Sequence, residues 1–390
     1  MRATVAHSGP MTSSLTIKNL VLLGAGHAHV HVLHGLAQRR PADLNITVIA
    51  PYPRQLYSGM VPGFMAGHYT LDDCVIPLQP LIDACGARYV NASAIGLDLE
   101  RNRVLLNDGH SVAWDWLSVN TGPVLDRDVI ERQMPGARAN ALFVRPIEAF
   151  GKLWPEVRAL AATRPIHVAV VGAGAAGLEL AMAAAHVLPE GSRVTVVTGG
   201  PPVAANYPPG LRQRVQRALR RLNITVLPDV CTGFGPGEVR LASGARLACD
   251  APLLAVGAQA PGWLQDSGLA LDEAGFMAVN SFQQSTHHAQ VFAAGDVASR
   301  VDAPHPRSGV YAVRAGPSLL ENLRASMAGE SLKAYHPAPR SLNLLACGDR
   351  YAVGAWGNFS FEGRWVWRWK DRIDRAFIAQ YTPGLRPRPD

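Results

Sequence analysis

The chain lacks the features that mark several classes of protein. It contains no uninterrupted apolar stretch of about 18 residues, so no membrane-spanning helix is expected. Its five cysteines form no C-x-x-C or C-x-x-x-x-C pair; their odd number and wide spacing argue against a disulfide framework or a zinc site and favour a reducing compartment. Only 17% of the residues are charged and 48% are hydrophobic, which describes a globular protein and not a disordered one.

The N-terminal residues and the net charge support further expectations. Residues 1–16 are polar and lack the apolar core of a secretory signal, so we expect a disordered leader and a cytoplasmic location. The formal net charge of +7 fits an anionic partner such as a nucleotide, a membrane surface or nucleic acid, although basic residues scattered over a surface give the same total. The basic residues are dispersed and no DNA- or RNA-reading motif is present, so no nucleic-acid role is expected.

A dinucleotide-binding unit is predicted near the N-terminus. The apolar run at residues 20–23 predicts a strand buried on both faces of a parallel sheet, and a helical stretch follows it. Between them, Gly24 permits a tight turn and Gly26 lets a pyrophosphate approach the backbone, where the helix N-terminus supplies N–H donors. The motif is imperfect, because His29 replaces the third glycine and Ala50 replaces the acid expected after the second strand. The alternative is an ordinary strand–loop–helix of another α/β protein.

Four histidines, at positions 27, 29, 31 and 34, cluster at this predicted helix start. His27 and His31 have the i, i+4 spacing of a helical metal pair. Their place at a phosphate-binding helix start favours packing or phosphate contact, so no metal site is predicted.

The same pattern recurs later in the chain and is complete there. Residues 166–171 predict a buried strand, and Gly172, Gly174 and Gly177 form an intact G-x-G-x-x-G before an alanine-rich helix. Residues 123–145, between the two units, contain prolines and a glycine and are predicted to be an irregular linker.

Two further predicted strands end in short segments that contain glycine. The first ends in Thr121-Gly122, and the second ends in Gly295-Asp296. A helix containing Gly309 and Val310 follows, at residues 309–325. Each piece is weak alone, but the order of two glycine motifs and two such strand ends is specific.

With these pieces, the chain resembles the two-dinucleotide-binding-domain flavoproteins of the pyridine nucleotide-disulfide oxidoreductase superfamily, over roughly residues 17–330. It looks closest to the type II NADH dehydrogenases and sulfide:quinone oxidoreductases. The segments GAGHAHVHVL, YSGMVPG and WRWKDRIDRAFIAQY resemble NADH dehydrogenase-like proteins associated with selenide, water dikinase.

The resemblance implies an α/β fold with two Rossmann-like dinucleotide-binding domains of the glutathione-reductase-like type and a small C-terminal α+β region. The FAD-binding domain would comprise residues 17–127 and 259–330, and the NAD(P)-binding domain residues 141–258. Residues 331–390 would form the C-terminal region with its amphipathic helix.

The resemblance also implies a role for each motif. The first glycine turn and the helix start at residues 27–29 would hold the FAD pyrophosphate. The strand end at Thr121-Gly122 would lie against FAD, Asp296 would bind a ribitol or phosphate-linked oxygen, and Gly295 would let the backbone approach. Residues 309–316, which begin with Gly309 and Val310, would run beneath the flavin ring, where the dipole at the helix N-terminus stabilises an anionic reduced flavin. The second glycine motif would hold NAD(P)H as electron donor.

Glu179 completes a G-x-G-x-x-G-x-E pattern, and the resemblance makes it a proton-relay candidate near the nicotinamide. The alternative is an acid favoured by the dipole at a helix start. The redox cysteine pair of the disulfide reductases is absent, so disulfide reduction is not expected. Cys347 has no obvious partner and is expected to be a buried structural residue. Thr198 is followed by neither an acid nor an arginine, so the sequence indicates neither NADH nor NADPH, and nicotinamide binding itself stays open.

The C-terminal stretch at residues 364–381 combines tryptophan with lysine and arginine on a short amphipathic helix, which suits a membrane interface. The alternative is packing on the protein's own flavin domain or in a homodimer. The leading hypothesis is an FAD enzyme that passes electrons from NAD(P)H to a quinone-like acceptor, on the inner face of the cytoplasmic membrane if it attaches there. Flavin-dependent conversion of a small sulfur or selenium compound, and a flavin-bound sensor or partner protein, are the alternatives.

Overall fold

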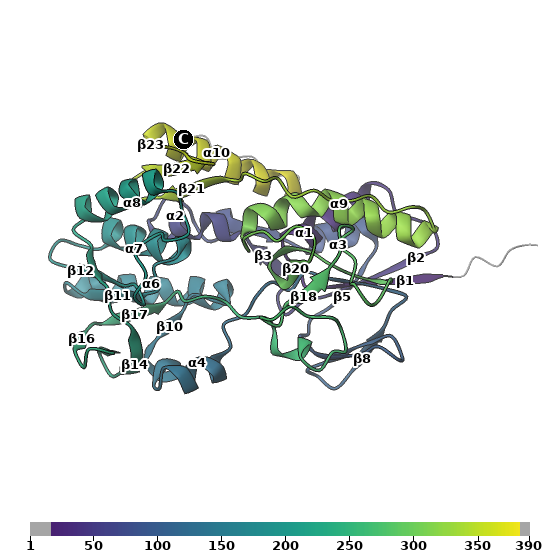
Figure 1. The fold of residues 1–390 in the computed structure, drawn as a ribbon, viewed down its shortest axis with the longest axis horizontal. Helices are drawn as coiled ribbons and strands as arrows, with labels where there is room; N and C mark the ends of the chain where they lie inside the picture. Colours follow the sequence, from purple (N-terminus) through teal and green to yellow (C-terminus); the bar gives the residue numbers. More distant parts are fainter. Residues whose placement is uncertain (1–16, 383–390) are drawn as a thin grey trace, which may run out of the picture.

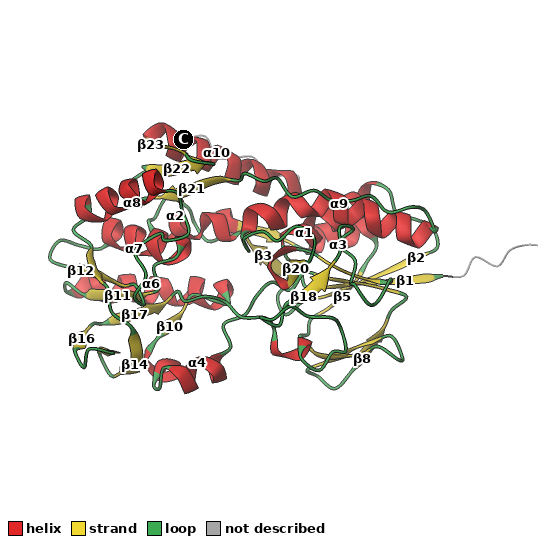
Figure 2. Ribbon diagram, in the orientation of Figure 1, coloured by secondary structure: helices red, strands yellow, loops and turns green. Residues whose placement is uncertain are grey.

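The computed structural model describes residues 17–382, so the predicted leader lies outside the described residues. In Figure 2 the strands gather into two separate groups, each accompanied by helices. The first group contains a five-stranded parallel sheet. Its strands, in spatial order, are β19 (Val291–Ala293), β9 (Trp116–Val119), β1 (Lys18–Leu23), β2 (Leu44–Ile49) and β5 (Arg88–Val90).

The predicted strand at residues 20–23 is confirmed, because β1 is buried on both faces. Leu20 and Leu22 join a core with α1 (His27–Gln38), and Val21 and Leu23 face the opposite side. The helices α3 (Gln79–Cys85) and α9 (Gly309–Ala328) pack on the α1 side. The other face carries an antiparallel sheet of β6 (Ala94–Asp98), β7 (Arg103–Leu106) and β8 (Ser111–Ala113).

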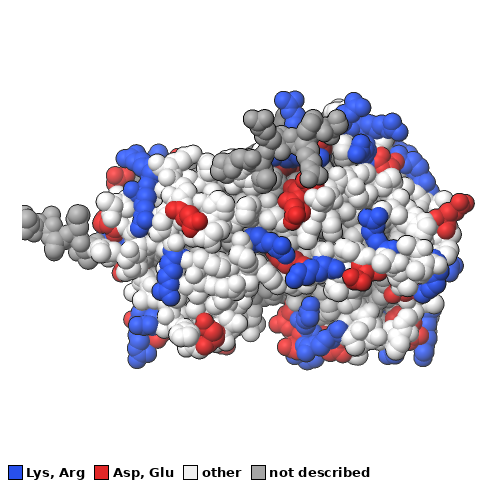
Figure 3. Space-filling view, turned by 180° about the vertical axis from the view of Figure 1, so that it is seen from behind, with Lys and Arg blue, Asp and Glu red and all other residues white. Residues whose placement is uncertain are grey.

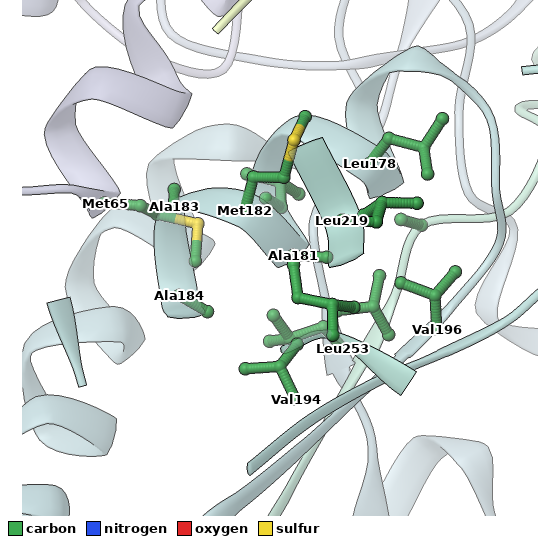
Figure 4. Packing of buried hydrophobic residues seen from close by; sticks show 14 of the residues in the cluster. Met65, Leu178, Ala181, Met182, Ala183, Ala184, Val194, Val196, Leu219 and Leu253 are labelled. Atoms are coloured by element: carbon green, nitrogen blue, oxygen red, sulfur yellow. The ribbon is translucent and has the colours of Figure 1, made fainter. Parts of the chain in front are cut away.

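The second group repeats this plan. Its parallel sheet has the order β10 (Leu142–Phe143), β17 (Ala251–Leu254), β11 (His167–Val171), β12 (Arg193–Val197) and β13 (Thr225–Leu227). In Figure 4 the small side chains Ala181 and Ala184 of α7 (Ala175–Val187) let this helix approach Val194 and Leu253 of the sheet. The neighbouring helices are α6 (Ile147–Thr163) and α8 (Pro209–Arg221), and an antiparallel sheet comprises β14 (Cys231–Gly235), β15 (Glu238–Leu241) and β16 (Arg246–Ala248).

The prediction of an irregular linker at residues 123–145 is wrong. Two short helices lie there, α4 (Arg127–Gln133) and α5 (Ala137–Asn140). The carboxylate of Asp126 caps α4 by accepting hydrogen bonds from the backbone N–H groups of Asp128 and Val129. Ile130 and Ala137 are buried in the core of the second domain. The prolines and glycine therefore mark the ends of short helices that help to complete that core.

The C-terminal region connects the two domains. Its antiparallel strands β21 (Leu342–Ala346), β22 (Ala352–Trp356) and β23 (Phe359–Gly363) pack on α7 and α8 of the second domain. The last helix, α10 (Arg364–Tyr381), then runs along the top of Figure 1 towards α9, and its residues Phe377 and Tyr381 join the core of the first domain. This helix thus joins the C-terminal strands, which pack on the second domain, to the core of the first domain.

The remaining elements are short. They are β3 (Arg54–Leu56), α2 (Val61–Met65), β4 (Val75–Pro77), β18 (Met277–Val279) and β20 (Ala298–Arg300). Of the helices in residues 17–382, none is long and apolar enough to cross a membrane.

Candidate active site

The first site lies at the edge of the first sheet where its parallel strands end. Gly24 directly follows β1, while Thr121-Gly122 and Gly295-Asp296 follow β9 and β19 after one intervening residue, so the predicted FAD residues come together. A Cβ on Gly24 would meet the Cα of Thr121 at 2.6 Å, and φ at Gly24 is +87°. Only glycine allows this turn to lie so close to the neighbouring strand.

Asn120 holds the three strand ends together. It is buried, and its side-chain oxygen accepts hydrogen bonds from the backbone N–H groups of Ala28 (3.1 Å) and His29 (3.2 Å). Its amide nitrogen donates to the carbonyl of Ala294 (2.5 Å), and its backbone carbonyl accepts from the N–H of Gly26 (3.1 Å). One side chain therefore fixes the first turn of α1 against the ends of β9 and β19.

His29 occupies the position of the missing third glycine. Its ring is fully buried, with Nδ1 2.5 Å from the carbonyl of Gly24 and Nε2 2.8 Å from the hydroxyl of Ser118. Burial lowers the pKa of His29 to about 4, so the ring is neutral at pH 7. Of the two predicted roles, the geometry supports packing; the ring has no nitrogen left for a phosphate.

His27 is placed differently, because buried polar atoms near it have no partner among the described residues. These atoms are Nε2 of His27 and Oε1 of Gln55, whose side-chain nitrogen lies 3.5 Å from Nδ1 of His27. Burial, helped by the positive charge of Arg145, lowers the pKa of His27 to about 4. Buried polar atoms without partners are rare in folded proteins. They fit a polar cofactor at this place, as the FAD prediction requires.

Charge at this edge is balanced between Asp296 and Arg145. Burial raises the pKa of Asp296, while the positive charges of Arg145 and Arg307 oppose this shift. Ser308 is the N-cap residue of α9, but its side chain does not accept a hydrogen bond from the backbone N–H groups of the first turn, which begins with Gly309 and Val310. Gly309 lies near Ser58: a Cβ on Gly309 would be 3.8 Å from the hydroxyl oxygen of Ser58.

The second glycine motif adopts the geometry predicted for it. A Cβ on Gly172 would meet the carbonyl oxygen of Ala255 at 2.3 Å, and one on Gly177 would meet the carbonyl oxygen of Gly172 at 2.1 Å. Gly174 is the N-cap of α7, is exposed, and has no atom within 4 Å of its Cβ position. Gly172 and Gly177 thus allow close packing, and Gly174 leaves room for a ligand at the helix N-terminus.

Glu179 lies where α7 meets the C-terminal region. Its Oε1 accepts a hydrogen bond of 2.8 Å from the backbone N–H of Ala346 on β21. Burial raises the pKa of Glu179 to about 7, against the opposing effects of Lys370 and of that hydrogen bond. Its carboxyl group can therefore gain or lose a proton near neutral pH, which a solvated helix-start acid does not do.

A buried polar cluster lies next to Glu179, formed by Tyr57, Lys370 and Asp374. The ammonium group of Lys370 donates to the carboxylate of Asp374 and to the carbonyl of Gly59, both at 2.6 Å. Although burial lowers the pKa of Lys370, the carboxylates of Asp374 and Glu179 outweigh it and raise the pKa overall. Burial and the charge of Asp374 raise the pKa of Tyr57, whose hydroxyl bonds to Asp374.

This cluster and two other residues are absent from the sequence prediction. Lys370 and Asp374 are an i, i+4 pair on the amphipathic C-terminal helix, a pattern that is usually a solvated ion pair. Asn120 directly precedes the predicted Thr121-Gly122 strand end, and that position is a usable signal. Nothing in the sequence distinguishes Arg145.

The histidine and cysteine predictions can be compared with the structure. His31 bonds to the hydroxyl of Tyr381 (3.0 Å), which joins α1 to α10. Within residues 17–382, no group of three or more His, Cys, Asp and Glu is placed to hold a metal ion. All five cysteines are buried and unpaired, and burial raises the pKa of Cys347 to about 12, so it is a structural residue as predicted.

Comparisons with known proteins identify a matching family and several similar proteins. Residues 18–316 match the family described as pyridine nucleotide-disulphide oxidoreductase. The NADH dehydrogenase-like protein MT1860 of Mycobacterium tuberculosis (strain CDC 1551 / Oshkosh) is 26% identical over 306 residues, which cover 73% of this chain and 74% of that protein. The demethylphylloquinone reductase NdbB of Synechocystis sp. is 27% identical over 58% of each chain. The structure of the sulfide:quinone oxidoreductase from Aquifex aeolicus shares the fold, with a TM-score of 0.78 at 18% identity over 93% of this chain and 91% of that one.

Proposed function

Because the chain belongs to the pyridine nucleotide-disulphide oxidoreductase family, we propose that it takes a hydride from NAD(P)H and passes electrons through FAD to a quinone-like acceptor. Asn120, His27 and Gln55 would define the FAD site with the first glycine turn, and the second glycine motif would hold NAD(P)H. When bound, FAD supplies a ring that takes up a hydride and releases its electrons to a second acceptor. The acceptor class is supported by the names of the quinone reductases to which this chain is similar.

The observation that carries this proposal is the buried cluster of Tyr57, Lys370 and Asp374 beside Glu179. A quinone needs two protons for each pair of electrons, so its site must supply protons as well as position the ring. Glu179, with a pKa near 7, can exchange one with water at neutral pH. The ammonium group of Lys370 stabilises negative charge that develops on a reduced oxygen. The residues at the junction of the domains and α10 thus provide both functions.

A small sulfur or selenium compound is the second candidate acceptor or donor. The similarity in fold to a sulfide:quinone oxidoreductase supports it. The five buried cysteines, with Cys347 at a pKa of about 12, offer no reactive thiol to such a compound. The link to selenium metabolism stays a prediction from sequence resemblance.

We also propose that the protein touches a membrane through an aromatic patch at the start of α10. This patch consists of exposed apolar residues on β22, β23 and α10: Trp356, Phe359, Trp365, Trp369 and Ile373. Within the patch, the rings of Trp365 and Trp369 stack with their centroids 6.3 Å apart. The exposed Arg364, Arg368 and Arg372 lie on the same helix, and Figure 3 shows Lys and Arg at the upper edge of this end of the molecule. Tryptophan beside arginine fits an anionic lipid interface.

Anaerobic stopped-flow absorbance tests the electron path. We expect NADH or NADPH to bleach the flavin band within seconds, and a soluble quinone analogue to restore it faster than sulfide or selenite does. Lys370→Met should slow the restoration, while Lys152→Met, which removes an exposed lysine on α6, should not. A flavin that stays oxidised with both nucleotides would refute the proposed donor and favour a sensor. Equal restoration in both variants would refute the role of Lys370.

Sedimentation with lipid vesicles tests the membrane proposal. We expect binding to vesicles that contain anionic lipid, and loss of binding in the double variant Trp365→Ser/Trp369→Ser. Ile95→Ser serves as control, because Ile95 is similarly exposed (60%) but lies on β6, outside the aromatic patch. Unchanged binding in the double variant contradicts the proposal, and a concentration-dependent dimer in the absence of lipid would assign the patch to a homodimer.

A further inference from the structure

A pocket at the end of β12 bears on the choice between NADH and NADPH. It has a volume of about 510 Å³ and lies beside the residues that follow this strand, Thr198 and Gly200. β12 pairs with β11, the strand that leads into the glycine motif, and both strands run in the same direction. In a dinucleotide-binding unit, this is the place of the adenosine ribose, whose 2′ oxygen distinguishes the two nucleotides.

The pocket contains one charged side chain, and it is basic. Arg220 of α8 lines the pocket together with Gln216, and apolar residues such as Val203, Leu219 and Ile224 form its walls. No carboxylate is among the lining residues, so no acid is present to accept hydrogen bonds from the two ribose hydroxyls of NADH. Thr198 is buried, and its hydroxyl accepts from the N–H of Gly200 (3.3 Å) within the turn.

The nearest acid in sequence to the pocket is engaged elsewhere. The carboxylate of Asp229 accepts from the backbone N–H of Val230 (2.7 Å) and from the hydroxyl of Ser243 (2.5 Å). Both of its oxygens therefore accept hydrogen bonds from within the protein, one from the residue before β14 and one from the turn after β15.

Arg220 also differs from its neighbours on α8. The side chains of Arg217 and Arg221 form ion pairs with Glu362 (2.6 Å) and Asp349 (2.9 Å). Within residues 17–382, no ion pair or hydrogen bond engages the side chain of Arg220, which is exposed. An exposed guanidinium group without an ion pair can bind a phosphate with two parallel hydrogen bonds.

We infer that Arg220 makes the second domain selective for NADPH by binding the phosphate on the 2′ oxygen of its adenosine. This inference rests on the proposed function, in which that domain holds the nicotinamide donor. The ribose of NADH would meet an unpaired arginine and no acid, whereas the phosphate of NADPH provides the negative charge that this pocket lacks.

Binding of two nucleotide fragments to the full-length, FAD-loaded protein tests the inference. Adenosine 2′,5′-bisphosphate and adenosine 5′-monophosphate differ only in the 2′-phosphate, and isothermal titration calorimetry gives their dissociation constants. We expect the bisphosphate to bind about 10- to 100-fold more tightly, the range for charge-assisted hydrogen bonds. Arg220→Gln should remove this difference. Arg193→Gln, which deletes the same charge at the opposite end of β12, should preserve it.

Each other result overturns the inference. Equal affinities, a difference that survives in Arg220→Gln, or no binding of either fragment would all exclude recognition of the 2′-phosphate by Arg220. The proposed function can fail separately: tight binding of the bisphosphate without bleaching of the flavin by NADPH would refute hydride transfer and leave the inference standing. Conversely, equal bleaching by NADH and NADPH with equal fragment affinities would refute only the inference.

Discussion

Replacing Asn120 by alanine should both destabilise the protein and empty its FAD site. The change removes the acceptor of two backbone N–H groups, at Ala28 and His29, and the donor to the carbonyl of Ala294. All three groups are buried, and each buried polar group left without a partner costs about 1–3 kcal/mol. Reorientation of the first turn of α1 would give some of these groups new partners, so we expect the free energy of unfolding to fall by about 3–6 kcal/mol in total.

Urea denaturation measures this free energy, and the ratio of flavin to protein absorbance measures the FAD content. Asn45→Ala is the matched control, because Asn45 is exposed and makes one long hydrogen bond of 3.4 Å to Asn19. The control should stay within about 0.5 kcal/mol of the unmodified protein. If the free energy of unfolding of Asn120→Ala lies within about 1 kcal/mol of that of the unmodified protein and the variant retains its FAD, then Asn120 does not hold the strand ends together.

The remaining predictions concern buried titratable groups. Lowering the pH from 6.5 to 4 should reduce the free energy of unfolding by about 3 kcal/mol through His29. The reason is that His29 takes up a proton below pH 6.5 in the unfolded chain but only near pH 4 in the folded protein. In His29→Gly this part of the pH dependence should vanish from denaturation curves, and an unchanged slope would contradict it. Glu179→Gln should remove a step near pH 7 from the rate of acceptor reduction and leave flavin bleaching by NAD(P)H unchanged; a step that persists assigns the proton to another group. Lys370→Met should destabilise the protein by about 3–5 kcal/mol, since it leaves Asp374 buried and unpaired, and adding Asp374→Asn should restore most of this loss in denaturation.

Sequence periodicity and glycine spacing predict much of this protein. The two glycine turns, the strands that lead into Thr121 and Gly295, and the family are confirmed, because short local patterns specify them and parallel strands bring their ends to one edge. The cofactor roles of the individual residues stay predictions. Helices α4 and α5 were missed, since short helices bounded by proline and glycine look like a loop.

The polar cluster could not be predicted for a different reason. Tyr57, Glu179 and Lys370 come from three distant parts of the chain. They meet only because β21–β23 pack on the second domain and direct α10 back across the first. The sequence shows the amphipathic helix but not which face turns inward, and the inward face carries the charged pair.

The two faces of α10 place the buried polar cluster a short distance from the exposed aromatic patch. Trp365 and Trp369 are exposed on one side, while Lys370 and Asp374 are buried on the other. An α-helix with its side chains is about 10 Å thick, so the cluster lies about that far from the aromatic patch. Under the proposed membrane contact, an acceptor with an apolar tail would reach this cluster while its tail stays in the lipid.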